Sequence, residues 1–265
     1  MNTLSAQPRF TPPSRPAKAS RAVLGLVILA AGASSACGDA TLDLVDPDLG
    51  LLAHWAFDER QTGAIAVDSA GFGFDATPSP NPPTSTTDAP PVKFHDPTSL
   101  SFNGQDQWLQ IGNPPLLDAG GAITLAAWVR PASVDGYHVV LSHGFRNDPN
   151  FEVSLRINDG RYEFTYWNSM DHEGAANIAP SDLGTWVHLC GTFDGAQYVL
   201  YRNGVQAATT ADTATPPPNI DTPWAIAARI APPDPASRLF QGAIDDVRIY
   251  GRALGAAEVE ALARR

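Results

Sequence analysis

The sequence predicts an all-β protein: an antiparallel β-sandwich with one short helical segment near its C-terminus. Three observations support this prediction. The 265 residues include 22 glycines and 24 prolines, too many helix-breaking residues for a helical bundle. Apolar runs are short, rich in β-branched and aromatic residues, and separated by turn residues. Apolar residues make up 43% of the chain, enough for a sizeable core and too many for a disordered protein.

Before the first predicted strand, the N-terminal segment has the composition of a bacterial secretory signal. Residues 1–36 contain four basic and no acidic residues, and an apolar run at 22–33 precedes small residues and Cys37. That run is too short for a membrane-spanning helix, which needs about 20 residues. The small residues before Cys37 resemble a bacterial lipobox, in which the cysteine is acylated after cleavage. We therefore predict a signal peptide at 1–37, a lipid anchor on Cys37, and a location in the bacterial cell envelope. The alternative is simple cleavage after Ala36 and secretion.

Residues 38–50 are acidic, contain Pro47, and are predicted to be a linker. The whole chain carries a formal charge of −11, which argues against nucleic acid as a partner because such binders need a basic face. The only other cysteine, Cys190, lies in an apolar strand-like run. With Cys37 acylated it would have no disulfide partner, and we predict that it is a core residue.

The strands begin at residue 51 and follow in short, regular steps. Residues 51–57 form the first predicted strand, and a proline-rich loop follows at 78–92. Strands at 99–104 and 107–111 flank a turn, and the run at 123–129 is strongly apolar.

The clearest hairpin joins residues 151–157 to residues 161–167. Its apolar side chains alternate with Glu152, Ser154 and Arg156, which indicates strands with one buried face. Asn-Asp-Gly at 158–160 supplies the positive φ angles that a tight hairpin turn requires.

The rest of the chain repeats this pattern. A second hairpin is predicted at 185–193 and 197–202, and a loop rich in Thr and Pro at 212–223. The last strand is expected at 242–250, and only 254–264 has a helical pattern. Many short strands at fairly regular spacing are typical of a sandwich.

Several segments carry a family resemblance when taken together. They include WAFDE at 55–59, LSFNG at 100–104, TLAAWVR at 124–130, GTFDG at 191–195 and FQGAIDDVRIY at 240–250. In order and spacing they resemble the LamG-type (laminin G) members of the concanavalin A-like lectin/glucanase superfamily. The resemblance covers about residues 51–262, and implies one jelly-roll domain over 51–265.

The resemblance implies a fold but no single function, because one fold carries many different sites. We expect a monomeric, non-catalytic binding module that recognises carbohydrate or glycoprotein. Two alternatives remain open: a glycan-active hydrolase or lyase, and a structural or adhesion module with a protein partner.

Candidate ligand-binding residues lie on the outward face of the 151–167 hairpin and in the segment before it. They are Trp167, Arg156, Glu163, His143 and Arg146. An aromatic plane beside hydrogen-bonding side chains suits a sugar, which has an apolar ring face and a polar rim. The alternative is that a loop at 168–182 covers Trp167 and makes it part of the core.

For the enzyme alternative, Glu152 and Glu163 lie on the outward faces of adjacent strands and could form an acid pair. The expectation that we prefer is that they are two solvated strand carboxylates. A retaining glycosidase needs two carboxyl groups about 5–5.5 Å apart. No Glu-x-Asp-x-x-Glu arrangement is present, and no catalytic residue is assigned.

The family often holds a structural calcium ion between its first and last strands. The matching positions here are Glu59, Asp68, the carbonyl groups around Gly73, and Asp246. Calcium prefers six to eight oxygen ligands, which such residues supply. The alternative is that these acids cap turns and strand ends.

Overall fold

The computed structural model describes residues 46, 48–93, 95–117, 120–144, 151–168, 170–215 and 220–264. These residues belong to one compact unit, Leu44–Arg265. The predicted signal peptide with Cys37, most of the 38–50 linker, and Arg146 lie outside the described residues. In the described ranges, no helix is long and apolar enough to cross a membrane.

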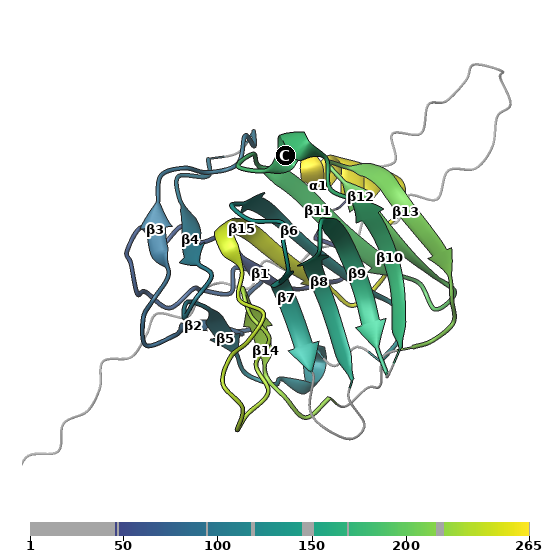
Figure 1. Ribbon diagram of the computed structural model, residues 1–265, viewed down its shortest axis with the longest axis horizontal. Coiled ribbons are helices and arrows are strands. Elements are labelled where there is room, and N and C mark those ends of the chain that lie inside the picture. The colour runs from purple at the N-terminus through teal and green to yellow at the C-terminus, as the bar shows by residue number, and fades with distance from the viewer. Residues whose placement is uncertain are drawn as a thin grey trace, which may run out of the picture. The chain divides into compact units, whose positions relative to one another are not determined.

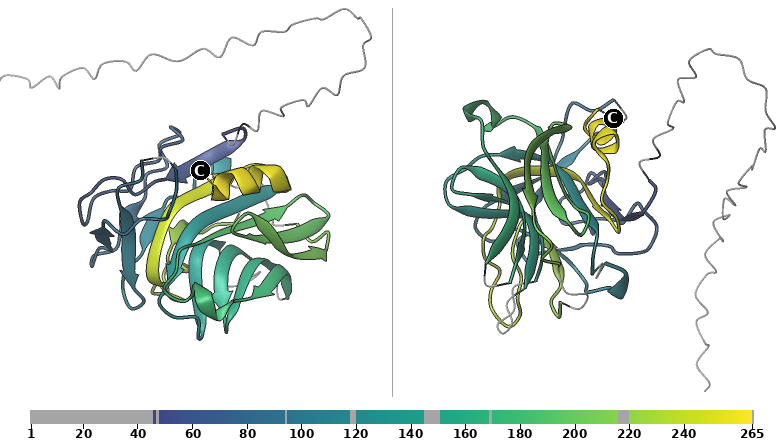
Figure 2. Two further views of the ribbon diagram at one scale, coloured as in Figure 1. Left: turned by 90° about the horizontal axis from the view of Figure 1, so that it is seen from above. Right: turned by 90° about the vertical axis from the view of Figure 1, so that its right-hand side faces the viewer.

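Two antiparallel sheets form the predicted sandwich (Figures 1 and 2). The 7-stranded sheet carries the candidate site. Its order is β10 (Asp171–Asn177), β9 (Arg161–Trp167), β8 (Glu152–Asn158), β7 (Tyr137–Gly144), β14 (Trp224–Ile226), β5 (Leu109–Ile111) and β2 (Thr77–Pro78).

The 8-stranded sheet lies on the other side of the core. Its order is β13 (Val205–Ala211), β12 (Gln197–Arg202), β11 (Val187–Phe193), β6 (Ile123–Pro131), β15 (Gln241–Tyr250), β4 (Ser99–Asn103) and β3 (Thr84–Thr86). Strand β1 (Leu51–Trp55) pairs with the C-terminal half of β15, and β4 pairs with its N-terminal half. Short 3-10 turns occur at Pro115–Leu117 and Pro180–Asp182.

The predicted hairpin at 151–167 is confirmed as β8 and β9. Asn158 pairs with Arg161, so only Asp159 and Gly160 form the turn, at φ values of 43° and 80°. These positive φ angles match the right-handed twist of the two strands. The apolar side chains of both strands face the core, as their alternation predicts.

The core fills the space between the sheets with large aromatic side chains. Close packing depends on a glycine at one point. A Cβ atom on Gly191 of β11 would lie 2.1 Å from the ring of Phe164 of β9, so a side chain there would displace the ring. Gly191 thus allows the two sheets to approach at the centre of the domain.

Two features differ from the sequence-based expectations. Residues 171–177 form strand β10, whereas the alternative for Trp167 assumed a loop at 168–182. The segment contains Gly174 and two alanines, so its sequence has little strand character; its pairing along all of β9 determines its conformation.

The second difference is a bulge in β15 between Asp245 and Arg248, with Asp246 at φ 49°. The bulge breaks the simple alternation that we assumed for Asp245 and Asp246.

The predicted C-terminal helix is α1 (Ala256–Ala263), which lies on the outer side of the 8-stranded sheet (Figure 2). Val259 and Leu262 pack there in a cluster that contains Cys190. Cys190 is a free, fully buried thiol, and burial raises its pKa. It is therefore a core residue and not a nucleophile.

Candidate binding site

The outer face of the 7-stranded sheet carries polar side chains on β8 and β9, opposite to the core. Glu152, Ser154 and Arg156 come from β8, and Glu163 and Thr165 from β9. All five are buried, with at most 3% of their surface exposed. The sequence correctly assigns them to the face opposite the core, but the expectation that Glu152 and Glu163 are solvated is wrong. They are buried because they pair with arginine side chains that lie over the sheet.

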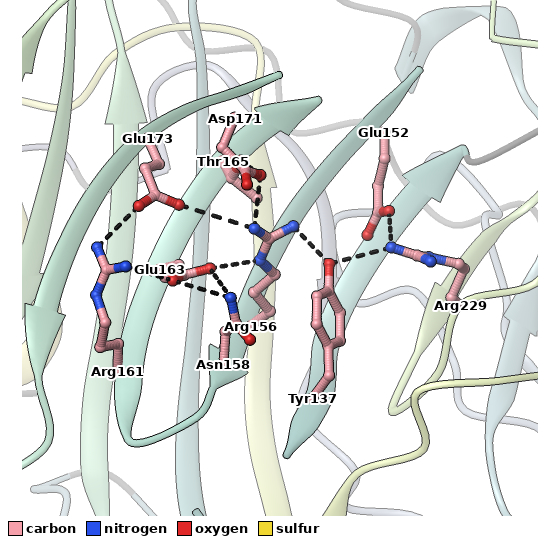
Figure 3. Close-up of polar contacts among 10 residues, drawn as sticks. All are labelled: Tyr137, Glu152, Arg156, Asn158, Arg161, Glu163, Thr165, Asp171, Glu173 and Arg229. Atoms are coloured by element: carbon pink, nitrogen blue, oxygen red, sulfur yellow. Dashed lines mark hydrogen bonds and ion pairs between the residues drawn. The ribbon is translucent and has the colours of Figure 1, made fainter. Parts of the chain in front are cut away.

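Arg156 is the centre of one half of this network (Figure 3). Its Nε donates to Glu163 Oε2 at 2.7 Å, and its Nη2 donates to Asp171 Oδ1 at 2.7 Å. Its Nη1 donates to the Tyr137 hydroxyl at 2.5 Å. Burial raises the pKa of Glu163, although Arg156 favours its ionised form. A fixed guanidinium group with three partners on three other strands has little freedom to move.

The second half of the network is built on Arg229, in the segment that follows β14. Its Nη2 donates to the Tyr137 hydroxyl at 3.0 Å and forms an ion pair with the buried Glu152. Tyr137 therefore lies between Arg156 and Arg229, as Figure 3 shows. Burial, with the nearby Glu152 charge, raises the pKa of Tyr137 to about 12. The phenol is a neutral bridge between the two ion pairs.

A pocket opens beside this network, with a volume of about 200 Å³. It is smaller than the roughly 300 Å³ at the low end of pockets for drug-sized ligands, and so suits a single small ring. Its lining residues are Tyr137, Arg156, Asn158, Trp167, Asp171, Arg229 and Arg238. They come from four adjacent strands and from the segment after β14.

Trp167 supplies the aromatic surface of the pocket. Its side chain is half-buried at the end of β9, beside the tight turn into β10. The indole N–H is buried and, among the described residues, has no hydrogen-bond acceptor. A buried donor without an acceptor costs free energy. A ligand in the pocket can contact the exposed part of the indole ring, and not this buried N–H.

The structure brings together two of the five predicted ligand residues, Trp167 and Arg156, in one pocket. Glu163 lies behind Arg156 and does not line the cavity. Arg146 is outside the described part of the chain.

His143 is the clear correction. It faces the core side of β7, opposite Val153, and is only 2% exposed. Its ring stacks on Trp224 at 4.6 Å, and its Nε2 lies 2.9 Å from the Thr222 carbonyl oxygen. Burial lowers its pKa to about 4. The prediction took His143 from the segment before the hairpin, and the side of the sheet on which it lies depends on the register of β7.

Sequence reasoning missed several pocket residues: Tyr137, Asn158, Asp171, Arg229 and Arg238. Tyr137 starts the apolar run 137–141, and antiparallel pairing places it across from Asn158. An apolar run is typical of a strand, so the sequence alone indicates that Tyr137 begins one. Arg229 and Arg238 come from beyond β14, which inserts between β7 and β5; no local pattern indicates this position.

Two of the four residues predicted to bind calcium, Asp68 and Asp246, are engaged in hydrogen bonds and ion pairs within the protein. The two carboxylate oxygens of Asp68 accept four backbone N–H groups, from His54, Ala70, Phe72 and Phe74. Asp246 pairs with His54 Nε2 at 2.5 Å and with Arg248 Nη2 at 2.9 Å. These oxygens are already used within the protein. Over the described ranges, no three acidic, histidine or cysteine side chains are arranged to hold a metal ion.

Other carboxyl groups near β15 have unused oxygens. Both oxygens of Asp96 and Oδ2 of Asp245 are buried without a hydrogen-bond donor among the described residues. Burial raises the pKa of Asp96 to about 7 and that of Asp245 to about 10, and repulsion from Asp58 and Asp246 adds to both shifts. Oxygens of this kind fit a hard cation. Calcium binding thus stays a prediction.

Comparison with known proteins agrees with the fold. Mouse (Mus musculus) pappalysin-1 is 29% identical over 129 residues, which cover 43% of this chain and 8% of that protein. The chain therefore spans less than a tenth of this relative's length.

Two solved structures share the architecture. Domain 4 of AbnA, a GH43 extracellular arabinanase from Geobacillus stearothermophilus, in complex with arabinotriose, is 24% identical with a TM-score of 0.62. The alignment covers 81% of this chain and 98% of that one. The binding domain of botulinum neurotoxin DC in complex with SialylT is 12% identical with a TM-score of 0.60, over 82% of this chain and 52% of that one. Likeness at these identities establishes the fold alone.

The family itself is established by sequence. Residues 103–260, more than half of the chain, match the Laminin_G_3 family, which is described as concanavalin A-like lectin/glucanases superfamily. The matched range includes every residue that lines the pocket. The chain belongs to the Laminin_G_3 family of the concanavalin A-like lectin/glucanase superfamily.

Proposed function

We propose that this protein is a carbohydrate-binding module that holds one sugar ring of a saccharide or glycoprotein glycan in the pocket between Tyr137 and Trp167. The observation that carries the proposal is the half-buried indole of Trp167, which lines one pocket together with polar side chains. A sugar ring can stack on the indole and form hydrogen bonds with the polar side chains around it.

The polar groups around Trp167 are held in place before any ligand arrives. Arg156 is fixed by Glu163, Asp171 and Tyr137, and these residues come from paired strands. Groups that are already ordered lose little entropy on binding, which favours affinity. The domains most similar in fold include one solved with arabinotriose and one with SialylT, which supports this ligand class.

The geometry does not favour the enzyme alternative through Glu152 and Glu163. Glu163 pairs with Arg156, four residues along β8 from Glu152, and four residues of strand span about 13 Å. Glycosidase carboxyl groups are about 5–5.5 Å or 6.5–9.5 Å apart. Each carboxylate is instead engaged by a different arginine.

A glycan array tests the function directly. The wild-type protein should retain a defined set of glycans, and Trp167→Ala should lose them. Trp186→Ala is the matched control, because Trp186 is a half-buried indole bound to Asp88, outside the pocket. An array with no retained glycan would contradict the proposal and favour the adhesion alternative with a protein partner.

We also propose that Cys37 is acylated and anchors the protein in a bacterial cell envelope. The support is the basic head, the apolar run and the small residues before Cys37. Growth with an alkyne fatty acid should label the wild type and not Cys37→Ser. Cys190→Ser is the control and should keep its label, because Cys190 is buried in the core. Labelling that persists in Cys37→Ser would refute the anchor.

A further inference from the structure

We propose that the pocket selects acidic saccharides, meaning sugars that carry an anionic substituent, and that Arg238 binds this substituent. The inference rests on the proposed saccharide-binding function and specifies its ligand class. It follows from the charges around Tyr137, the backbone at Arg238 and the size of the pocket.

Three guanidinium groups surround one aromatic ring. The Cζ atoms of Arg156, Arg229 and Arg238 lie 4.8, 5.2 and 4.5 Å from the centroid of the Tyr137 ring. Such positions are favourable for each cation alone. Three like charges so close together repel one another, so the arrangement needs negative charge nearby.

The protein supplies that negative charge to two of the three. Arg156 is paired with Glu163 and Asp171, and Arg229 is paired with Glu152. Arg238 is exposed, and no acidic side chain among the described residues lies within ion-pair distance of it. The positive charge of Arg238, at the rim of the pocket, is therefore available to pair with an anionic group of a ligand.

The backbone at Arg238 also points to a binding role. Its φ is 56°, in the left-handed region that non-glycine residues rarely adopt. The segment is fixed there by the Val139 N–H, which donates to the Arg238 carbonyl oxygen at 2.8 Å, and by His138 Nδ1, 2.8 Å from the Leu239 carbonyl oxygen. Strain of this kind persists only where surrounding structure enforces it, and it concentrates at ligand sites. Here it holds the Arg238 side chain over Tyr137.

The same pocket explains why the anion would belong to a sugar. Trp167 and Arg238 both line a cavity of about 200 Å³, which fits one ring and not a large polyanion. The indole can stack on the ring face, while the planar guanidinium fork can hold a carboxylate or a sulfate through two parallel hydrogen bonds. Asn158 and Asp171 remain available for hydroxyl groups.

The test uses the full chain on an array that pairs each neutral oligosaccharide with its uronate, sialylated and sulfated counterparts. We expect the acidic member of a pair to bind about 10- to 100-fold more tightly, the range for charge-assisted hydrogen bonds. Arg238→Gln should remove this preference. Arg60→Gln is the matched control, because Arg60 is also exposed, has a φ of 53°, and does not line the pocket.

The outcomes separate this inference from the proposed function. Neutral glycans retained as well as their acidic counterparts, or a preference that survives Arg238→Gln, would overturn acidic selectivity while leaving saccharide binding intact. An array that retains no glycan would overturn both. The uronate, sialylated and sulfated members of the array show which anionic group is accepted.

Discussion

The ion pair between Arg156 and Glu163 gives the sharpest prediction about how the candidate site is held together. We consider Arg156→Met, which keeps most of the side-chain volume and removes the charge. Glu163 is 0% exposed and Arg156 is 3% exposed, so water screens this pair very little. Removing one partner of a buried pair costs about 3–5 kcal/mol. Glu163 keeps Arg161 as a partner, with Arg161 Nη1 at 3.3 Å from Glu163 Oε1. We therefore expect Arg156→Met to lower the free energy of unfolding by about 3 kcal/mol, at the low end of that range.

The reverse substitution should cost less. In Glu163→Gln, Arg156 keeps Asp171 at 2.7 Å and the Tyr137 hydroxyl at 2.5 Å, and Arg161, which also loses Glu163, keeps Glu173 at 2.8 Å. Because neither guanidinium group is left without an acidic partner, we expect a loss of about 2 kcal/mol in the free energy of unfolding. The double variant should lower the free energy of unfolding by about 2 kcal/mol, well below the sum of the two single losses, because it leaves no isolated buried charge.

Urea unfolding at neutral pH, followed by tryptophan fluorescence, measures all four free energies of unfolding in this cycle. An Arg156→Met loss below about 1 kcal/mol, or a double variant equal to the sum of the two, would refute the reasoning.

Three further predictions concern the fold and its ions. Gly191→Ala should lower the free energy of unfolding by about 1–3 kcal/mol, because its Cβ would lie 2.1 Å from the Phe164 ring; unchanged thermal unfolding would contradict the described sheet packing. Burial lowers the pKa of His143 to about 4, so the unfolded chain takes up a proton at this residue below about pH 6.5 while the folded protein stays neutral. Stability should therefore fall by up to about 3 kcal/mol between about pH 6.5 and pH 4, and His143→Gln should flatten that slope; equal slopes would count against the burial of this ring. If the protein binds a structural calcium ion, EDTA should lower Tm by roughly 5–10 °C and calcium should restore it. An unchanged Tm in calorimetry would remove the calcium prediction.

Local patterns were sufficient to predict most of the fold. The alternation on either side of Asn158-Asp159-Gly160 predicts both the β8–β9 register and which side chains enter the core. Strand β10 could not be predicted in this way, because its sequence has weak strand character and its pairing with β9 determines its structure.

The candidate site was predicted only where it lies on that hairpin. Trp167 and Arg156 follow from strand periodicity, and both line the pocket. His143 was misplaced because its face depends on the register of β7. Arg229 and Arg238 join the site only after β14 has inserted between β5 and β7. That step is a tertiary event without a local sequence signal.

The central claim, that a sugar binds against Trp167, can be tested by nuclear magnetic resonance on protein labelled with ¹⁵N at the tryptophan indoles. The Trp167 signal is identified as the one missing in Trp167→Ala, and a glycan retained on the array is then titrated into the wild type. Because the Trp167 indole lines the pocket, a sugar ring that stacks on it should change the surroundings of its N–H and move the resonance strongly. The fully buried Trp55, whose indole N–H donates to the Phe74 carbonyl oxygen at 2.9 Å, should not respond. A glycan that binds and leaves the Trp167 resonance in place would contradict the proposed site.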